Sequence, residues 1–528
     1  MNKFEEIKAA RDGLDVLPDI MRYAQSGWEA ITDDDKARMK WYGLFFRKHT
    51  PGYFMLRVRI PNGIATADQM RVLTGITRDF GRDQMDITTR QQIQLRWFRI
   101  EHVPEIFDRI RAAGLDHRQT GMDNIRGVMG CPLAGLTQQE ILDASPIAHS
   151  LSRRLSGDKA FSNLPRKFNV SITGCTENCV PASSQDLALV PAVREGPAGP
   201  RAGFNVYIGG KMGSGGFTPA RALEVFVEAE HAEELCVQVI FLFRDHGFRE
   251  ARSRARFAFL IEAWGIERIR AELEVRMGGP LERAGQDLRR TYEADHIGIV
   301  PLMRPDTYAV GLAVPVGRLT PDQVEEAASL AEKYGDGTIR LTPKQNIMLT
   351  GIAGGRLGRL LAEPLLATLR PNAAGSVRGT VACTGIGLCD LALTDTKADA
   401  LAVANQLADH LPPCSRPISI NWSGCPAGCG NHQMADIGLQ GGKARVGDTV
   451  KEVYQVYVGG RSGRYARAGR ELVAQVPSDQ IGSVVERLAL AHARGADLAE
   501  AGVAVLAGRD ETDVSHANGG ASASEHVA

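Results

Sequence analysis

The sequence lacks the features that carry a chain into a membrane or out of the cell. No run of about 18 apolar residues occurs, which excludes a hydrophobic transmembrane helix. The first residues, Met1 to Lys8, lack the apolar segment and small-residue cleavage site of a secretory signal, so we expect a cytoplasmic protein. Net charge is absent too, because 62 Lys and Arg residues balance 62 Asp and Glu residues. Without an overall field, we expect neither nucleic acid nor a membrane among the partners.

Disulfide and dinucleotide-binding patterns are also missing. The 9 cysteines are odd in number and cluster toward one end, which argues against a disulfide framework. No Gly-x-Gly-x-x-Gly fingerprint follows a predicted strand, and the glycines from Gly209 to Gly216 recur later in the chain, which favours structural turns. Electrons for any redox reaction must then come from another protein.

Four of the cysteines lie in one stretch, Ala382 to Gly430, as two short clips: Cys383-Thr-Gly-Ile-Gly-Leu-Cys389 and Cys425-Pro-Ala-Gly-Cys429. Thiolates are soft ligands that suit zinc or an iron–sulfur cluster. Four buried thiols without a metal are the remaining alternative, because cysteine is often simply a small core residue. The first clip is longer than the usual structural zinc clip, and glycines crowd the sulfurs, as a bulky inorganic core requires. The pattern therefore favours a [4Fe–4S] cluster.

An internal duplication sets the architecture. Several segments return in the same order about 250 residues later, among them Ile87-Thr-Thr-Arg-Gln-Gln-Ile-Gln-Leu as Leu341-Thr-Pro-Lys-Gln-Asn-Ile-Met-Leu. Ser171-Ile-Thr-Gly-Cys-Thr-Glu-Asn-Cys179 likewise returns as Asn421-Trp-Ser-Gly-Cys-Pro-Ala-Gly-Cys429. This period is far too long for a solenoid. We predict an α+β fold of two pseudo-symmetric halves, with mixed sheets and helices around a shared central cofactor site.

The chain divides into an N-terminal arm, two half-domains, two larger modules and a tail that we expect to be disordered. The arm covers residues 1–45, the first half-domain 46–118 and the first module 119–285. The second half-domain covers 300–370, the second module 371–506 and the tail 507–528. In the arm, Thr32 is suited to cap a short helix. In the first half-domain the pattern predicts a strand from Phe54, a helix from about Ala67 to Phe80 and a strand around Asp86 to Trp97.

The two halves differ in charge. The first carries Arg57, Arg59, Lys167 and Asn169 where the second carries Gly311, Ala313, Pro417 and Ser419. Unpaired buried cations are costly, so Arg57 and Lys167, which lie in apolar contexts, favour anion binding. Arg59 is expected to face water from an exposed strand.

The first half also keeps three of the four cluster cysteines. Cys131, Cys175 and Cys179 match ligands of the second half, but the fourth position is Thr137. Cluster binding by cysteine needs four thiolates. We therefore predict a relic site in which these three cysteines are not ligands. Cys236 and Cys414 are expected to be ordinary core or surface thiols.

The cysteine clips resemble the signature of the sirohaem-dependent nitrite and sulfite reductases, and the resemblance covers residues 40 to 505. It extends to Lys40-Trp-Tyr-Gly-Leu-Phe-Phe-Arg, Phe54-Met-Leu-Arg-Val-Arg, Thr88-Thr-Arg-Gln, Gly121-Met-Asp-Asn-Ile-Arg, Leu164-Pro-Arg-Lys-Phe-Asn and Asp395-Thr-Lys. These motifs look most like the ferredoxin-dependent nitrite reductases. The resemblance implies two ferredoxin-like half-domains and two reductase-type modules, with sirohaem and a [4Fe–4S] cluster as cofactors.

The resemblance also assigns roles to individual residues. The cluster ligands would be Cys383, Cys389, Cys425 and Cys429, and Cys429 would also bridge to the sirohaem iron. Arg57, Arg126, Lys167 and Asn169 would line the substrate pocket. Arg90 would contact sirohaem carboxylates, together with Gln94 and Arg96.

The activity that the resemblance implies is the six-electron reduction of nitrite to ammonia in nitrogen assimilation, by a monomer that takes electrons from ferredoxin or flavodoxin. Sulfite reduction by the same machinery is the main alternative. A cobalamin-pathway relative and a non-catalytic metal-binding protein are the others. Sulfite reductases of this family usually carry a second Lys where this chain has Asn169, which favours nitrite, the smaller monoanion.

Overall fold

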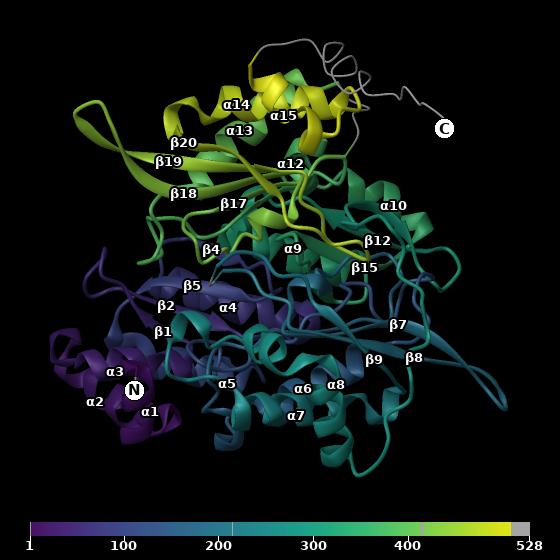
Figure 1. Ribbon diagram of the computed structural model, residues 1–528. Coiled ribbons are helices and arrows are strands. Elements are labelled where there is room, and N and C mark those ends of the chain that lie inside the picture. The colour runs from purple at the N-terminus through teal and green to yellow at the C-terminus, as the bar shows by residue number, and fades with distance from the viewer. Residues whose placement is uncertain (1, 214, 413–416, 508–528) are drawn as a thin grey trace, which may run out of the picture. The chain divides into compact units, whose positions relative to one another are not determined.

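The computed structural model describes residues 2–213, 215–412 and 417–507 (Figure 1). The chain forms two compact units, which are described separately. The first runs to Ala373 and also contains Gly387–Asp390 and Ser462–Ala466; the second contains Ala374–Ile386, Leu391–Arg461 and the chain from Arg467 onward. No helix among the described residues is both long and apolar enough to cross a bilayer. The predicted disordered tail lies almost entirely outside the described residues, as does Cys414.

The N-terminal arm is helical, as Figure 1 shows in purple. It contains α1 (Lys3–Ala10), α2 (Leu17–Ser26) and α3 (Asp33–Arg38). The predicted cap is confirmed, because the Thr32 hydroxyl accepts a hydrogen bond of 3.1 Å from the Asp35 backbone N–H. The buried Trp41 ties the arm to the rest of the unit by donating from its indole N–H to the Ser162 carbonyl at 2.8 Å.

The first half-domain is a five-stranded sheet with helices on one face. Its order is β1 (Leu44–Phe46), β2 (Phe54–Val58), β5 (Ile93–Phe98), β4 (Met85–Ile87) and β13 (Arg318–Leu319). The accompanying helices are α4 (Ala67–Phe80) and α5 (Val103–Ala112). The helix predicted over 67–80 is confirmed. The single strand predicted around Asp86 to Trp97 is wrong: it is two strands joined by a tight turn in which Gln91 adopts a φ of 55°.

The second half-domain repeats this plan. Its sheet has the order β11 (Gly298–Pro301), β12 (Thr307–Leu312), β15 (Ile347–Ala353), β14 (Thr338–Leu341) and β3 (Ile64–Thr66). Its helices are α9 (Pro321–Tyr334), α10 (Gly354–Leu361) and α11 (Leu365–Thr368). Each half-domain lends one short strand, β3 or β13, to the sheet of the other.

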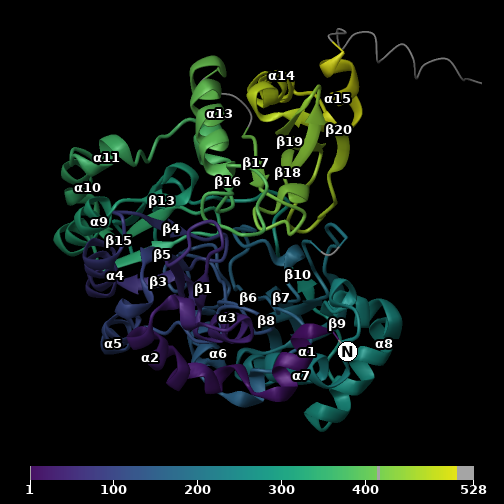
Figure 2. The same ribbon diagram turned by 90° about the vertical axis from the view of Figure 1, so that its left-hand side faces the viewer.

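Equivalent hydrogen bonds also link the two half-domains in both directions. The Gln91 side chain donates to the Leu341 carbonyl at 2.8 Å, and the equivalent Gln345 donates to the Ile87 carbonyl at 2.8 Å. Helices α4 and α9 lie side by side (Figure 2), and each begins with a capping box. The predicted α+β class and the pseudo-symmetric halves are confirmed.

The first larger module is built on a sheet with the order β10, β7, β8, β9, in which β6 pairs with β7. These strands are β6 (Val170–Ile172), β7 (Leu187–Gly196), β8 (Gly199–Ile208), β9 (Arg221–Val227) and β10 (Gln286–Asp287). Its helices are α6 (Ser145–Leu155), α7 (Ala229–His246) and α8 (Phe257–Met277). Cys236 is buried in the core on α7, as expected.

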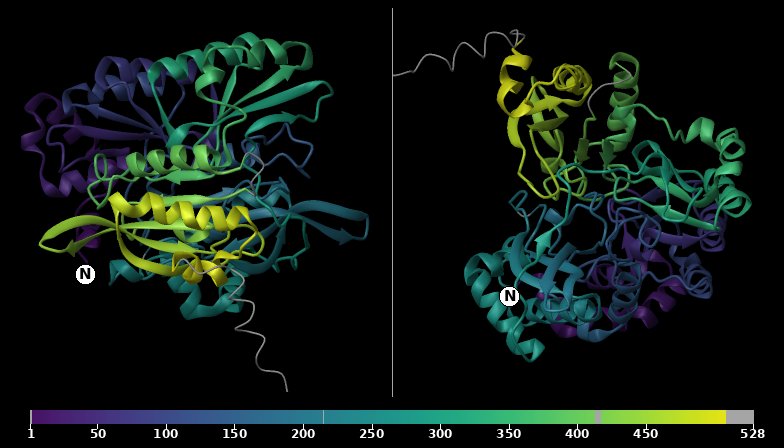
Figure 3. Two further views of the ribbon diagram at one scale, coloured as in Figure 1. Left: turned by 90° about the horizontal axis from the view of Figure 1, so that it is seen from above. Right: turned by 90° about the vertical axis from the view of Figure 1, so that its right-hand side faces the viewer.

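The second larger module has the sheet order β16 (Thr380–Ala382), β17 (Ile420–Ser423), β18 (Ile437–Val446), β19 (Thr449–Val458) and β20 (Arg470–Pro477). Its helices are α12 (Gly375–Arg378), α13 (Thr396–His410), α14 (Ile481–Ala493) and α15 (Leu498–Leu506). Hairpin β7–β8 in the first module and hairpin β18–β19 in the second are the long twisted ribbons in Figure 3.

Candidate functional site

A row of polar side chains crosses the first half-domain sheet. Arg57 on β2 and Asp86 on β4 both pair with Gln94 on β5, so the three side chains share one face. Arg96, two residues further along β5, shares that face and forms a buried ion pair of 2.7 Å with Asp86. It also donates a hydrogen bond to the Gln94 side chain. The predicted cofactor contacts Gln94 and Arg96 therefore interact with each other and with an acid inside the sheet.

The two arginines of β2 have different environments. Arg57 is half-buried, donates to the Thr120 carbonyl at 2.7 Å and lies 5.1 Å from the centre of the Phe45 ring. The expectation that Arg59 faces water is wrong, because only 2% of it is exposed. The loop after the half-domain covers it, and its guanidinium donates to the carbonyls of Arg118 at 3.0 Å and Arg126 at 3.2 Å.

The predicted pocket residues Arg126, Lys167 and Asn169 lie on two adjacent segments. The Arg126 backbone N–H donates to the Phe168 carbonyl at 2.8 Å, which places Arg126 beside the two residues that flank Phe168. Arg90, at the turn between β4 and β5, donates from its Nε to the Asn169 side-chain oxygen at 3.1 Å. The structure therefore brings Arg90, Arg126, Lys167 and Asn169 together.

Positive charges outnumber negative charges among the groups that shift the pKa of Arg126 most. Burial is the main cause that holds the pKa of Arg126 well below its ordinary value, and the positive charges of Arg57, Arg90 and Arg166 lower it further. The acid that opposes them, Asp123, is already bound at two points by Arg252, at 2.9 Å each. A buried cation without a counter-charge is costly. We call Arg57, Arg90, Arg126 and Arg166 the basic cluster; Lys167 follows Arg166 in the chain.

Two buried nitrogen atoms of the basic cluster have no hydrogen-bond partner in the part of the chain that the structure describes. They are Nη1 of Arg126 and Nε of Arg166, whereas Nη2 of Arg126 donates to the Met122 carbonyl at 2.9 Å. Buried donors are normally satisfied, so these atoms leave room for a further acceptor. The basic cluster is therefore suited to bind an anion.

Asn169 is held in place by a buried ion pair that the sequence did not reveal. Its backbone N–H donates to Asp186 at 2.9 Å, and Asp186 binds Arg256 at 2.8 Å with both side chains fully buried. The second half keeps the backbone contact, because the Ser419 N–H donates to Asp436 at 2.8 Å. Comparison of the repeats could have identified Asp186, since both copies carry an acid at this position.

Arg47 is a further residue that the sequence interpretation passed over, although it ends one of the family-like motifs. It is buried at the end of β1 and donates to the Gly387 carbonyl. Burial and the nearby Arg96 charge lower its pKa to about 10, while Cys389 and Asp390 oppose this. In the first unit, the segment Gly387–Asp390 thus brings Cys389 close to Arg47.

The other three predicted cluster ligands belong to the second unit. Cys383 follows β16 and Cys425 follows β17, and these parallel strands end at the same edge of the sheet. The Gly424 N–H donates to the Cys383 sulfur at 3.2 Å. Burial raises the pKa of the Cys383 thiol, and the nearby Cys429 raises it further. Within the second unit, Cys383 and the Cys425–Cys429 clip therefore lie at the same edge of the sheet.

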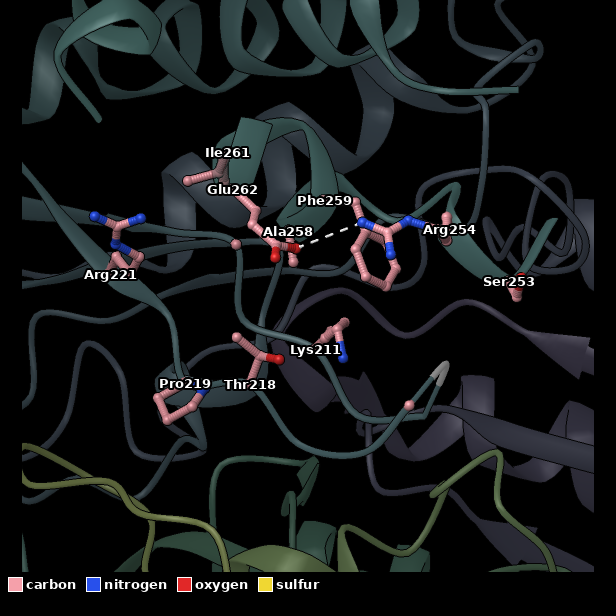
Figure 4. Close-up of a pocket in the computed structure, with 12 residues that line it drawn as sticks. Lys211, Thr218, Pro219, Arg221, Ser253, Arg254, Ala258, Phe259, Ile261 and Glu262 are labelled. Carbon is pink, nitrogen blue, oxygen red and sulfur yellow. Dashed lines mark ion pairs between the residues drawn. The ribbon is translucent and has the colours of Figure 1, made fainter. Parts of the chain in front are cut away.

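A separate cavity of about 620 Å³ in the first unit contains none of the predicted site residues (Figure 4). Arg254 and Glu262 form an ion pair of 4.0 Å across it. It borders the glycine-rich turn that begins at Gly209. A Cβ on Gly210 would lie 2.5 Å from the Gln185 carbonyl, so this glycine is needed for close backbone packing. This supports the prediction of a structural turn.

Comparison with known proteins identifies the family. The nitrite and sulphite reductase 4Fe-4S domain matches residues 121–281 and 373–497, and the nitrite/sulfite reductase ferredoxin-like half domain matches residues 46–113 and 302–367. The chain belongs to the nitrite and sulfite reductase family. The resemblance that the motifs indicated is thereby confirmed.

Relatives in this family match the chain over most of its length. The ferredoxin–nitrite reductase of Synechococcus elongatus is 41% identical over 92% of this chain and 96% of its own. The assimilatory ferredoxin-dependent nitrite reductase of Haloferax mediterranei is 37% identical over 93% of this chain and 89% of its own. The solved structure of the Mycobacterium tuberculosis NirA protein superposes with a TM-score of 0.89 at 31% identity, covering 97% of both chains.

The residues present fit the cofactors of the nitrite and sulfite reductase family. For a [4Fe–4S] cluster, the second unit supplies soft sulfur donors at one sheet edge, and Gly385 and Gly428 adopt φ values of 78° and 68°, which glycine reaches without strain. For a polycarboxylate such as sirohaem, the first unit supplies buried and half-buried arginines, and the Nη1 atoms of Arg47 and Arg126 have no hydrogen-bond partner among the described residues.

Proposed function

We propose that this protein reduces nitrite to ammonia with six electrons from ferredoxin, at a sirohaem coupled to a [4Fe–4S] cluster, in nitrogen assimilation. The observation that carries the proposal is the basic cluster, in which burial and three neighbouring positive charges lower the pKa of Arg126 while Asp123 opposes them. A bound anion would stabilise a buried cation in such surroundings. Nitrite is an anion small enough to share this site with an anionic cofactor.

Cys383, Cys389, Cys425 and Cys429 would hold the cluster, and the Cys429 thiolate would also hold the sirohaem iron. When bound, these groups supply the one-electron transfers and an open coordination position for the substrate. Arg90 would orient sirohaem through its carboxylates, while its hydrogen bond to Asn169 keeps it next to the substrate residues. Gln94 and Arg96 would support it from the sheet, held by the ion pair with Asp86.

The pocket residues would bind the anion and deliver protons. Arg57 and Arg126 carry fixed positive charges, which stabilise negative charge that builds on the nitrite oxygens. Lys167 would donate protons from Nζ, directly or through water, and each oxygen leaves as water when its bond to nitrogen breaks. In total, six electrons and eight protons convert nitrite into ammonium and two water molecules.

Asn169 is the residue that favours nitrite over sulfite. It is neutral, only 3% exposed, and accepts a hydrogen bond from Arg90. A lysine here would add a positive charge that better suits a dianion. A second ammonium about 4 Å from the anion is worth about 4 kcal/mol at an effective dielectric of 20, before desolvation is subtracted.

Replacing Asn169 with Lys should therefore lower kcat/KM for nitrite and raise it for sulfite. The Asn169→Ala variant is the matched control, because it removes the amide without adding charge and should not improve sulfite reduction. Steady-state kinetics of both variants with both anions measure the change. If the sulfite-to-nitrite ratio of kcat/KM were the same in Asn169→Lys as in the unmodified protein, this position would not set substrate choice.

The visible spectrum of the purified protein tests the proposed cofactors. Sirohaem gives strong Soret and red bands, whereas an iron–sulfur cluster alone gives a broad brown shoulder and zinc gives no band. We expect the Soret and red bands, and their displacement on addition of nitrite. A spectrum with the brown shoulder alone would point to a family member with different chemistry and would contradict the proposal.

A further inference from the structure

Besides the proposed cluster ligands, the protein has another group of side chains that could bind a metal, and this group lies within the first unit. Cys131, Cys175, Cys179 and His296 are all buried, and their sulfur and imidazole nitrogen atoms lie within 4.8 Å of one another. The three cysteines are those expected to form a relic site, in which Thr137 stands in place of the fourth ligand. The sequence could not reveal His296, because it lies in the link between the halves and has no counterpart in the repeat.

The spacing of these atoms fits one metal ion. Zinc binds thiolate sulfur at about 2.3 Å and imidazole nitrogen at about 2.0–2.1 Å. In a tetrahedron these bonds place two sulfurs about 3.8 Å apart, and a sulfur and a nitrogen about 3.6 Å apart. The Cys131 sulfur and the His296 Nε2 lie 3.7 Å apart. In a [4Fe–4S] cluster each ligand binds a different iron, which would need a wider set of donors.

The surroundings of the four side chains also suit a metal site. The Leu133 N–H donates to the Cys131 sulfur at 3.4 Å, and the Glu177 backbone bonds the Cys175 sulfur in the same way, two residues after the cysteine. A Glu177 carboxylate oxygen lies 3.7 Å from His296 Nδ1, on the side away from the cysteines. A negative charge on this side of the ring favours the tautomer with its proton on Nδ1, which leaves Nε2 able to bind a metal.

His296 itself is held in an unusual backbone conformation. Its φ is 56°, in the left-handed region that few residues other than glycine adopt. Backbone strain of this kind persists where the surrounding structure, including a bound group, fixes it. The conformation brings the ring to Cys131 directly before β11 begins at Gly298.

We propose that Cys131, Cys175, Cys179 and His296 bind one Zn²⁺ ion as a structural site, separate from the cluster and sirohaem. The three thiols release their protons to solvent when the ion binds, and neutral His296 supplies the fourth ligand. The ion joins the first larger module, which carries the cysteines, to the start of the second half-domain, which follows His296. The copy of the site in the first half would thus have kept a metal but changed which one it binds.

Metal analysis of the holoenzyme, purified without chelators, tests the proposal. We expect about one zinc per chain by elemental mass spectrometry. The X-ray absorption fine structure at the zinc edge should show three sulfurs at about 2.3 Å and one nitrogen at about 2.0–2.1 Å. This measurement needs no variant. Absence of zinc, zinc bound in any other ligand set, or iron sufficient for two clusters per chain would overturn the proposal.

Variants assign the ligands. Cys131→Ala and His296→Ala should lose the zinc and keep the iron content of the unmodified protein. Cys236→Ala, which removes a buried thiol on α7 in the same unit, is the matched control and should keep both metals. His296→Cys should retain zinc with four sulfur ligands. If Cys131→Ala kept its zinc with the same X-ray absorption fine structure as the unmodified protein, the ion would lie elsewhere.

Discussion

The Cys429→Ser variant should contain neither the iron–sulfur cluster nor sirohaem. Cys429 is the proposed ligand of both groups, and a serine hydroxyl is a poor substitute for a soft thiolate. Because the site is shared, one substitution should remove both cofactors and abolish nitrite reduction. Iron and sulfide content, together with the Soret absorbance of the purified variant, measure the loss directly and do not depend on an activity assay.

Cys236→Ser is the matched control for Cys429→Ser. Cys236 is fully buried in the core of the first larger module and bears no proposed ligand role, so this variant should keep its iron and its Soret band. If Cys429→Ser kept the Soret band at full strength, Cys429 would not bridge the two groups. If it kept all of its iron and sulfide as well, Cys429 would not be a ligand at all.

The Arg126→Gln variant should lose most of its activity without losing stability. Arg126 donates toward the proposed anion site from a position where burial and neighbouring cations oppose its charge. Removal of one preorganised donor of this kind typically lowers kcat by about 10²–10³-fold. Since the charge is unfavourable to the fold itself, the melting temperature of the apoprotein should stay the same or rise. Steady-state kinetics and thermal unfolding of the apoprotein test the two halves of this expectation.

Two further variants separate charge from geometry. Arg126→Lys keeps the charge but loses the planar donor group, so it should recover part of the lost activity. Arg99→Gln, which removes an exposed arginine paired with Glu101 on the surface, should behave as the unmodified protein. A large drop in the melting temperature of Arg126→Gln apoprotein, with activity near normal per folded molecule, would make Arg126 a structural residue.

Much of this fold could be predicted because the duplication repeats its local signals. The helix over 67–80 begins at a capping box that the second copy also has, and its apolar spacing is regular. The cysteine clips could be found because metal ligands leave a sharp pattern in the sequence. The charge differences between the copies identified Arg57 and Lys167 as candidates for anion binding, since a repeat acts as its own control.

The errors arose where distant segments decide the environment of a residue. Alternation along β2 puts Arg57 and Arg59 on one face, but only the folded chain shows that carbonyls of the following loop cover Arg59. The turn that divides β4 from β5 depends on the left-handed conformation of Gln91, which the sequence does not mark. His296 escaped notice because no short motif links it to cysteines more than a hundred residues earlier.

The electron balance of turnover tests the central claim most directly. The protein would be supplied with reduced ferredoxin and limiting nitrite, and the ferredoxin oxidised would be compared with the ammonium formed. We predict six electrons consumed for each ammonium, with nitrite nitrogen recovered as ammonium. Consumption of fewer electrons with another nitrogen product, or reduction of sulfite in clear preference to nitrite, would contradict the account.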